Sequence, residues 1–154
     1  MKYEKVWKKV LNPDEKVEYE FSISERYRKF MMVFLIIIII PLLFLDSSTR
    51  IVFVFAVLAV LFYFGFYVKI ANAYAFTNKR VLIYQGWIAT GIVSIDYAKI
   101  TDITAEEPFF EIIVTKSGTL SINTAGSPQP EVVLKHIDAP YEIKKKLDLL
   151  KDKT

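Results

Sequence analysis

This sequence of 154 residues contains no cysteine and a single histidine, His136. Without cysteine the chain can form no disulfide bond and can offer no thiolate as a nucleophile or metal ligand. One histidine, near the end of a predicted strand and with no obvious partner, cannot build a multi-histidine metal site. A Gly-rich phosphate loop and a nucleophile elbow are absent as well. We therefore expect no metal, no cofactor and no enzymatic activity.

An excess of one charge is also missing from most of the chain. The formal net charge is +3, and the segment from Ala71 to the C-terminus balances ten lysines and arginines against ten aspartates and glutamates. The positive excess lies in the first 29 residues and beside the apolar runs. A nucleic-acid-binding protein needs a basic face, which a balanced domain does not provide. We expect no nucleic-acid partner, and no pattern indicates a small-molecule substrate.

Two long apolar runs dominate the first half of the sequence. Phe30–Leu45 holds sixteen residues without a charge, and Ile51–Ile70 holds twenty with a single charge one position from its end. Twenty helical residues cover the roughly 30 Å hydrocarbon core of a bilayer, and the first run reaches that length if its helix starts near Arg26. We therefore predict two transmembrane helices, at about residues 27–45 and 51–70.

Two other interpretations of these runs fit the pattern less well. Buried helices of a soluble core keep a polar edge, and neither run has one around its circumference. A cleaved signal peptide would end in a small-residue cleavage pattern, whereas the first run starts only at residue 30 and is followed by a second run. Pro41 removes a backbone donor and should bend the first helix about one turn from its end.

The orientation of the predicted helices follows from the residues that flank them. Only five residues, Asp46 to Arg50, separate the runs, so the helices must be antiparallel neighbours. The loop has Arg50 alone, whereas the opposite ends carry most of the flanking positive charge. These cations are Lys16, Arg26, Arg28, Lys29, Lys69, Lys79 and Arg80. We therefore predict a multi-pass protein of the cell (inner or plasma) membrane, with both termini in the cytoplasm.

Residues 1–29 form a segment before the first predicted helix. Its first apolar side chains recur at helical spacing, which predicts a short amphipathic helix lying against the membrane surface or against the domain. These side chains are Tyr3, Val6, Trp7 and Val10. Apolar and polar residues then alternate over residues 17–23, as in a half-buried strand.

Residues 71–154 follow a period of two interrupted by turns, which is typical of a small β domain. We predict seven strands there: Ala73–Phe76, Arg80–Gln85, Ile92–Tyr97, Ile100–Ala105, Glu111–Thr115, Thr119–Asn123 and Val132–His136. Asn78 and Gly118 mark tight hairpin turns, and Thr124–Pro130 is expected to be a loop. Seven short strands imply a small barrel or sandwich.

The C-terminal residues return to a helical period. Asp138 can cap a helix, and Pro140 is acceptable in its first turn. Ile143, Leu147 and Leu150 form one apolar stripe. The open end of a small barrel would give this stripe a surface to cover.

Several short motifs, in this order of features, resemble those of a known family. They are Asn12-Pro13-Asp14-Glu15-Lys16, Tyr74–Leu82 (YAFTNKRVL), Gly86, Ile95, Ile100–Ile103 (ITDI), Gly118-Thr119-Leu120, Ile122–Gly126 (INTAG) and Asp138-Ala139-Pro140. The sequence resembles the bacterial pleckstrin-homology-like (PH-like) family of membrane proteins, a domain of unknown function with two N-terminal transmembrane helices. This resemblance implies a PH-like seven-stranded barrel or sandwich capped by a C-terminal helix, with no catalytic residues. The stretch Pro108–Ile113 lacks the family's Gly/Arg-rich turn, so we expect a tighter hairpin there.

Five basic residues are candidates for contact with lipid headgroups: Arg28, Lys29, Lys69, Lys79 and Arg80. Lys79 and Arg80 occupy the first β-hairpin, where eukaryotic PH domains often place residues that grip phosphoinositides. Neighbouring strand residues point to opposite faces, and no third cation lies near in sequence, so a simple turn is the favoured interpretation. Contact with anionic lipid, at about 1 kcal/mol per basic residue, would then support an anchor without headgroup specificity.

Paired carboxylates are the remaining candidates for chemistry. Glu106 and Glu107 with Glu111, or Asp96 with Asp102, could be proposed as acid–base pairs, which need side chains that converge in a cleft. These residues fall in or beside turns and at exposed strand positions. We therefore interpret them as solvated charges.

The leading hypothesis for function is a non-catalytic, membrane-anchored binding or scaffolding module. It would act by protein–protein interaction at the inner membrane surface, as a homo-oligomer or with a membrane protein partner, and its sheet edges could accept an added strand. The alternative is a module that senses anionic lipids. A less favoured hypothesis is an accessory subunit of a membrane enzyme or transporter. In each case the first partner is the lipid bilayer.

Overall fold

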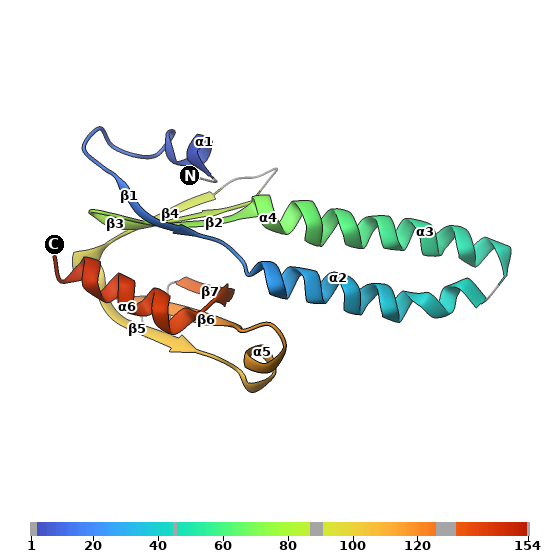
Figure 1. Cartoon of the computed structure of the whole chain (residues 1–154). Helices are drawn as coiled ribbons and strands as arrows, with labels where there is room; N and C mark the ends of the chain where they lie inside the picture. The colour runs from blue at the N-terminus through green and yellow to red at the C-terminus, as the bar shows by residue number, and fades with distance from the viewer. Residues whose placement is uncertain (1–2, 45, 87–90, 126–131, 154) are drawn as a thin grey trace.

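The computed structural model describes residues 3–44, 46–86, 91–125 and 132–153. Within these residues seven strands form two antiparallel sheets packed face to face, and two helical arms project together from one end of this sandwich (Figure 1). One sheet has the order β1-β2-β3-β4 and the other the order β5-β6-β7. The strands are β1 (Val17–Phe21), β2 (Asn72–Thr77), β3 (Arg80–Gln85), β4 (Gly91–Asp96), β5 (Ile100–Glu106), β6 (Ser117–Thr124) and β7 (Val132–Asp138).

The core of the sandwich follows from the period of two along its strands. Alternate side chains of β3 and β6 point inward, so Val81, Ile83, Leu120 and Ile122 are buried. They belong to one apolar cluster, which also includes side chains from the five remaining strands and from the C-terminal helix. Burial of each such side chain stabilises the fold by about 2 kcal/mol, and the cluster therefore holds the two sheets together.

The C-terminal helix α6 (Pro140–Lys151) packs on β5 and β6. The predicted apolar stripe is confirmed, because its members contact the core: Ile143, Leu147 and Leu150. The helix starts after Ala139, whose φ of 45° turns the chain from strand to helix. The prediction that Asp138 caps this helix is wrong, because Asp138 ends β7 and its carboxylate accepts a hydrogen bond from Ser24 instead.

The first helical arm follows β1. It consists of α2 (Glu25–Ile39) and a 3-10 turn, η1 (Ile40–Phe44). Pro41 lies in this turn, and because proline has no amide donor, the regular α-helix ends just before it. The change from α-helix to 3-10 turn thus falls where the bend was predicted.

The second arm returns toward the sandwich beside the first. It contains α3 (Ser47–Phe62), a π-helix η2 (Tyr63–Tyr67) and α4 (Val68–Ala71). Asp46 caps α3, since its Oδ2 accepts a hydrogen bond from the Ser48 amide at 3.2 Å. Most of the predicted connecting loop is therefore the first turn of a helix.

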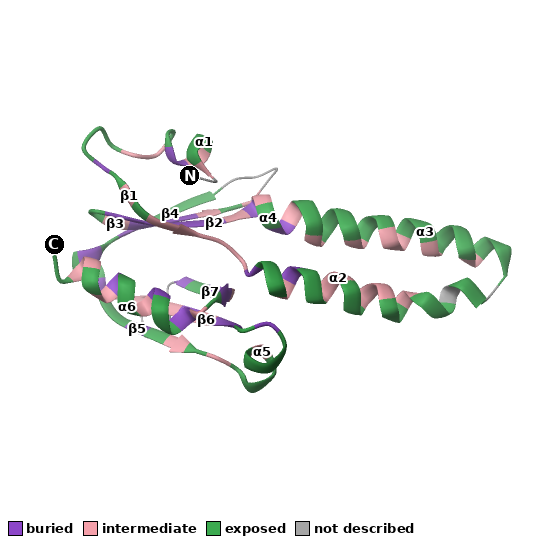
Figure 2. Ribbon diagram, viewed as in Figure 1, coloured by how far each residue is buried: buried purple, intermediate pink, exposed green. Residues whose placement is uncertain are grey.

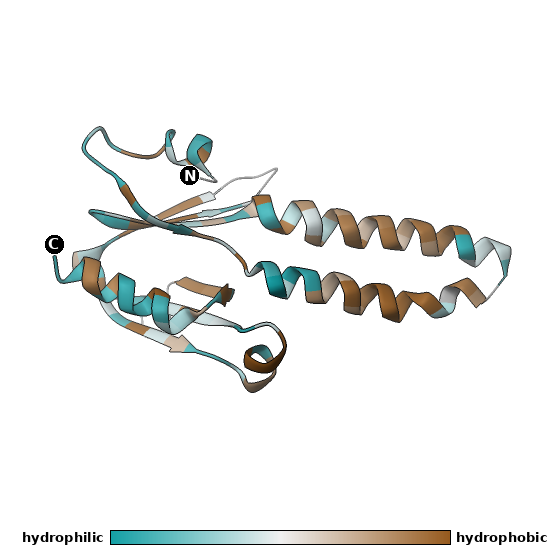
Figure 3. Cartoon of the chain, in the orientation of Figure 1, coloured by the Kyte–Doolittle hydropathy of each residue, from teal (hydrophilic) through white to brown (hydrophobic). Residues whose placement is uncertain are grey.

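Both arms expose apolar side chains along most of their length (Figures 2 and 3). By length and composition, one helix of the described residues could cross a membrane: the second arm, Ser47–Ala71, with a mean hydropathy of 2.7. The α-helix of the first arm has only 15 residues before η1, which is shorter than the roughly 20 residues that a membrane span needs. Of the two predicted spans, the structure thus supports one by these measures.

The two arms together form a helical hairpin, which lies in the sequence between β1 and β2, two neighbouring strands of one sheet. β1 pairs antiparallel with β2, and Phe21 lies opposite Tyr74. Only Ser22 and Ile23 separate β1 from the residue that caps α2, and β2 begins directly after α4. Residues 1–29 therefore contribute a strand to the sandwich, at the position of the half-buried strand predicted over residues 17–23.

The short helix α1 (Glu4–Trp7) lies against the outer face of this sheet. Trp7 is 1% exposed and packs on Ala73, Ala75 and Leu82. Its indole Nε1 donates a hydrogen bond to the carboxylate of Glu20 at 3.2 Å, which satisfies the buried polar edge of the ring. The amphipathic helix was predicted to lie against the membrane surface or against the domain, and in the structure it packs on the domain.

The predicted strand Glu111–Thr115 is wrong, because this segment belongs to a helix, α5 (Phe109–Val114). Both edges of the following strand, β6, are paired, with β5 and with β7, so the segment cannot form the predicted hairpin with β6. The connection from β5 to β6 is accordingly longer than the tight hairpin expected at Pro108–Ile113. Seven strands are nevertheless found in the described residues because β1 joins the sandwich. Residues 126–130 of the predicted loop lie outside the described residues.

Candidate functional site

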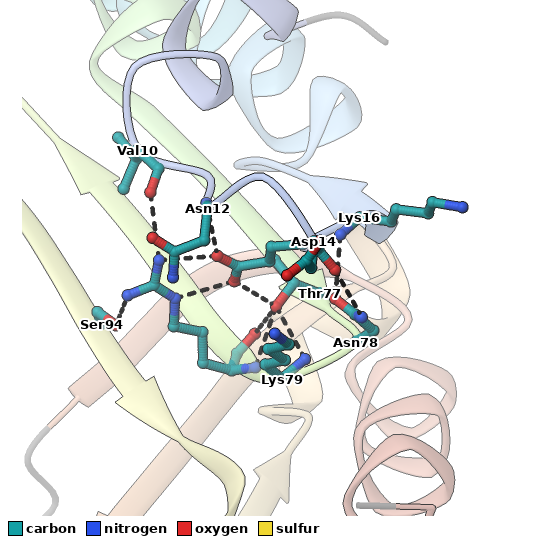
Figure 4. A network of polar contacts seen from close by, with 10 residues as sticks. Val10, Asn12, Asp14, Lys16, Thr77, Asn78, Lys79 and Ser94 are labelled. Atoms are coloured by element: carbon teal, nitrogen blue, oxygen red, sulfur yellow. Dashed lines mark hydrogen bonds and ion pairs between the residues drawn. The ribbon is translucent and has the colours of Figure 1, made fainter.

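The predicted basic hairpin holds a network of polar contacts that fixes the N-terminal segment (Figure 4). Arg80 donates from Nε to Glu15 Oε1 at 2.9 Å and from Nη2 to Glu15 Oε2 at 2.8 Å. Thr77 donates to the same carboxylate at 2.7 Å. The remaining nitrogen of Arg80, Nη1, donates to Ser94 Oγ at 3.0 Å, and Nη2 also reaches the Val10 carbonyl. The guanidinium is therefore occupied by acceptors of the protein itself.

This pairing changes the protonation of both partners. The carboxyl group of Glu15 is buried, yet hydrogen bonds from Arg80 lower its pKa to about 2. The same contact raises the pKa of Arg80, because the neighbouring carboxylate favours the charged guanidinium. The pair is thus ionised at neutral pH and acts as a structural clamp.

The position of this turn also bears on the lipid-contact prediction. β2 starts at the end of the helical arm and runs six residues to Thr77, which places the turn roughly 20 Å farther out at 3.3 Å per residue. Lys79 is exposed there, and Arg80 is paired with Glu15. If the arms enter a bilayer, neither residue would therefore lie among the lipid headgroups around them.

The other three predicted cations lie at the end of the sandwich where the arms begin. Arg28 is buried, and its Nη1 donates to the Phe64 carbonyl of the second arm at 3.1 Å. Lys29 is exposed and pairs with Glu25 one turn away at 2.9 Å. Lys69 is exposed, and its own main-chain carbonyl accepts a hydrogen bond from the hydroxyl of Tyr3 at 2.9 Å. Arg28 therefore joins the arms, and Lys29 and Lys69 remain at the surface.

Ser24 is the centre of the junction between the first arm and β7. Its Oγ accepts the amide of Tyr27, which caps α2, and donates to Asp138 Oδ1 at 2.7 Å. Its own amide donates to the His136 carbonyl at 2.7 Å. Next to it, Ile23 forms an antiparallel bridge with Ile137, which links the two sheets at this corner. The arm is therefore tied to both sheets.

His136 adds a second link at the same junction. Its ring stacks on Tyr27 with centroids 3.8 Å apart and planes 6° from parallel. Its Nδ1 lies 3.1 Å from Glu111 Oε1 of α5, and Glu111 Oε2 accepts the hydroxyl of Ser117 at 2.9 Å. The expectation of a histidine without a partner is wrong, and the ring connects α2 to α5.

A hollow of about 750 Å³ opens beside this junction. Its lining combines cations and carboxylates from α2, the β5–β6 connection and the end of β7: Glu25, Arg26, Lys29, Glu107, Ile112, Lys116, Asp138 and Ala139. Among its cations only Lys29 was predicted as a contact residue. Lys116 was missed because it lies far from Arg26 in sequence and reaches it only through the fold. The mixed charge suits a polar, ionic ligand better than an apolar one.

The carboxylates considered for acid–base chemistry do not meet in one cleft. Asp96 pairs with Lys99 at 3.7 Å, and Asp102 accepts the amide of Ile103 at 2.8 Å. Glu106 is exposed on β5, whereas Glu111 faces His136. Within the described part of the chain, no group of three or more His, Asp or Glu side chains could hold a metal ion.

Comparisons with known proteins agree on the fold. The family model described as Bacterial PH domain matches residues 27–151, and no curated protein matches the chain. Similar solved structures include a DUF1696 family protein with a pleckstrin-homology domain from Shewanella loihica PV-4 and a pleckstrin-homology domain from Shewanella amazonensis SB2B. Both are 12% identical with a TM-score of 0.53, covering 97% of this chain and 94% and 96% of theirs, respectively. Since the family model spans most of the sequence, this chain belongs to the bacterial PH domain family.

Proposed function

We propose that this chain is a membrane-anchored binding module, which docks a protein partner or a second copy of itself at the inner surface of the cell membrane. Its PH-like sandwich is of a kind that typically binds without catalysis. The observation that carries the proposal is an uncovered apolar hairpin joined directly to two neighbouring strands of the sandwich. The proposal has three parts: the membrane, the orientation and the docking edge.

Membrane anchoring follows from the exposed arms. Val33 is 58% exposed and Phe55 is 68% exposed. Contact of such apolar side chains with water is unfavourable, whereas the lipid of a bilayer would bury them. The second arm has 25 residues, and α2 with η1 has 15 and 5. At a rise of 1.5 Å per residue the second arm measures about 37 Å, enough for a hydrocarbon core of roughly 30 Å. The uncharged part of the first arm, from Phe30 to Phe44, measures about 25 Å, and the bilayer would thin locally to match it.

The orientation follows from charge. The cations Arg26, Lys29 and Lys69 surround the end of the arms at the sandwich, whereas the far tip carries Arg50 alone. Positive residues are retained on the cytoplasmic side. The sandwich and both termini would therefore lie in the cytoplasm.

The connections between arms and sandwich are too short to act as flexible linkers. Two residues separate β1 from the cap of α2, and no residue separates α4 from β2. Ser24 adds hydrogen bonds to Asp138 and to the His136 carbonyl across this junction. A domain held this way presents one fixed face along the membrane, which lowers the entropy lost when a partner docks.

The strand β4 is the edge best suited to that partner. It pairs with β3 on one side and is the last strand of its sheet in the described residues. Ile92 and Val93 are each 43% exposed, so apolar side chains accompany the free backbone edge. A partner strand added to this edge would satisfy its amides and carbonyls.

Photo-crosslinking of the full-length protein in its native membrane tests the proposal. A photo-crosslinking residue in place of Ile92 should yield a discrete adduct with one partner or with a second copy. The matched control replaces Lys145, an exposed residue on α6, and should yield none. Equal, diffuse crosslinking from both positions would contradict docking at β4.

A second candidate function, binding of anionic lipid, is favoured by the hollow at the junction. Arg26, Lys29 and Lys116 line it near the first turns of α2, where headgroups would lie if the arm enters the bilayer. Three carboxylates line the same hollow, which weakens its attraction for anions. Native mass spectrometry should show less retained phosphatidylglycerol for Lys116→Gln than for the distal control Lys79→Gln. Equal retention would remove this candidate.

A further inference from the structure

The helix α5 has its polar and apolar sides reversed relative to an ordinary surface helix. Its inward side chain, Glu111, contacts Ser117 and His136, and Thr115 at its C-terminal end is buried. Its apolar side chains all point to solvent, with exposed fractions of 43–79%: Phe109, Phe110, Ile112, Ile113 and Val114. A helix in water turns its apolar face toward the protein, so this arrangement indicates an apolar surrounding on the outside.

The position of α5 identifies that surrounding. α5 lies at the end of the sandwich from which the arms project (Figures 1 and 3). A small hollow between α5 and the first arm is lined by Tyr27, Phe30, Phe110 and Val114, among others. α5 is therefore level with the turn of α2 where the cation Lys29 gives way to the uncharged run that starts at Phe30. This is the level of the headgroup–hydrocarbon boundary if the arms span the bilayer.

Charged neighbours support the same assignment. Lys116 lies two residues after the end of α5 and lines the larger hollow together with Arg26 and Lys29. Exposed aromatic side chains with flanking cations are the combination that interfacial helices use on anionic membranes.

We propose that α5 is an interfacial anchor, which inserts Phe109, Phe110 and Ile113 into the headgroup–acyl boundary of the bilayer that holds the arms. This inference rests on the proposed membrane anchoring. The anchor fixes the β5-β6-β7 sheet to the membrane, whereas the arms continue directly into the other sheet. Both layers of the sandwich are then attached to the lipid surface.

The absence of cysteine allows a direct test with single-cysteine variants of the full-length chain. Phe110→Cys is labelled with a polarity-sensitive fluorophore and reconstituted in vesicles of phosphatidylcholine and phosphatidylglycerol. Val54→Cys, on the exposed face of α3, reports on the span, and Lys79→Cys reports on the distal turn. Lipids with a nitroxide near the headgroup should quench the label at Phe110, and lipids with a nitroxide on the upper acyl chain should quench the label at Val54. The label at Lys79 should respond to neither.

The outcomes separate the two proposals. Quenching at Val54 without quenching at Phe110 overturns the interfacial anchor and leaves the span intact. No quenching at either position overturns membrane anchoring and the inference with it. Oxidative disulfide formation between two copies at Phe110→Cys, with no lipid quenching, assigns α5 to a self-contact and also overturns the inference. Ile113→Cys repeats the measurement on the same face, so one poorly folded variant cannot decide the result.

Discussion

Glu15 and Arg80 are joined by two parallel hydrogen bonds of 2.9 and 2.8 Å, although the whole helical hairpin separates them in sequence. The contact fixes the segment before β1 to the turn between β2 and β3. A bidentate arginine–carboxylate pair has a planar geometry that lysine cannot reproduce. The turn suggested by sequence as a lipid contact thus holds the two halves of the sheet together.

Removing the charge of Glu15 should destabilise the protein more than removing an exposed charge nearby. In Glu15→Gln the Arg80 guanidinium stays partly buried without a counter-ion, which should cost about 3 kcal/mol and lower Tm by roughly 6–12 °C. Thermal unfolding of the detergent-solubilised full-length chain, followed by tryptophan fluorescence, measures the change. Glu18→Gln, an exposed position on the same strand region, is the control and should change Tm little. Equal Tm values for the two variants would contradict the clamp.

The same pair predicts an acid-dependent loss of stability. The pKa of Glu15 is lowered from 4.5 to about 2 in the folded protein because Arg80 donates to its carboxylate. Unfolded chains therefore bind this proton first as the pH falls, and the contribution is complete above about pH 4.5 and lost toward pH 2. The difference in Tm between the wild type and Glu15→Gln should be constant at neutral pH and disappear across this window. A difference that persists at about pH 2 would assign the effect to packing instead.

Much of the fold could be predicted from periodicity. Strand β1 alternates apolar and polar residues because one of its faces packs on the core, and the stripe of α6 repeats at Ile143 and Leu147 for the same reason. The segment of α5 was wrongly predicted as a strand, because a short apolar run fits a helix or a strand equally well. The predicted hairpin with β6 does not form, since β6 is paired with β5 and β7.

The candidate site was less predictable than the fold. Candidate basic residues could be identified from the sequence. Whether each one is free to bind a ligand depends on its partners in the fold, and the partners of Arg80 and Arg28 come from distant segments. Lys116 lines the hollow near Arg26, and its position depends on the helix α5, which forms most of the connection between β5 and β6. His136 showed no sequence signal for its stacking on Tyr27, since no local pattern encodes that approach.

Ser24→Ala should loosen the junction between the first arm and β7. The substitution removes the cap on the Tyr27 amide and the hydrogen bond to Asp138, both made by a fully buried hydroxyl. Loss of a cap and of one charged partner should cost about 2 kcal/mol. The matched control is Ser22→Ala, whose hydroxyl makes only a 3.4 Å contact with its neighbour's carbonyl. Thermal unfolding should separate the two variants, and equal Tm values would show that Ser24 is dispensable.

Gly118→Ala should disrupt the start of β6. A Cβ at this position would clash with the Glu106 carbonyl and lie 2.8 Å from Pro140 Cγ, and neither backbone nor proline ring can move easily. The strain should cost about 2 kcal/mol or more. In Gly91→Ala the nearest atom is 3.9 Å away, so this control should unfold like the wild type. Chemical denaturation of both variants gives the comparison, and a stable Gly118→Ala protein would contradict the close approach of β5 and α6.

Two single-cysteine variants test the predicted topology in cells, without background from other thiols. Ser48→Cys lies at the tip of the hairpin, and Lys145→Cys lies on the exposed face of α6. Because positive residues cluster at the sandwich end, the tip should face outward. A membrane-impermeant maleimide should label Ser48→Cys in intact cells and label Lys145→Cys only after the membrane is opened. Labelling of both in intact cells would contradict a cytoplasmic sandwich, and labelling of neither would place the tip on the inner side and refute two crossings of the membrane.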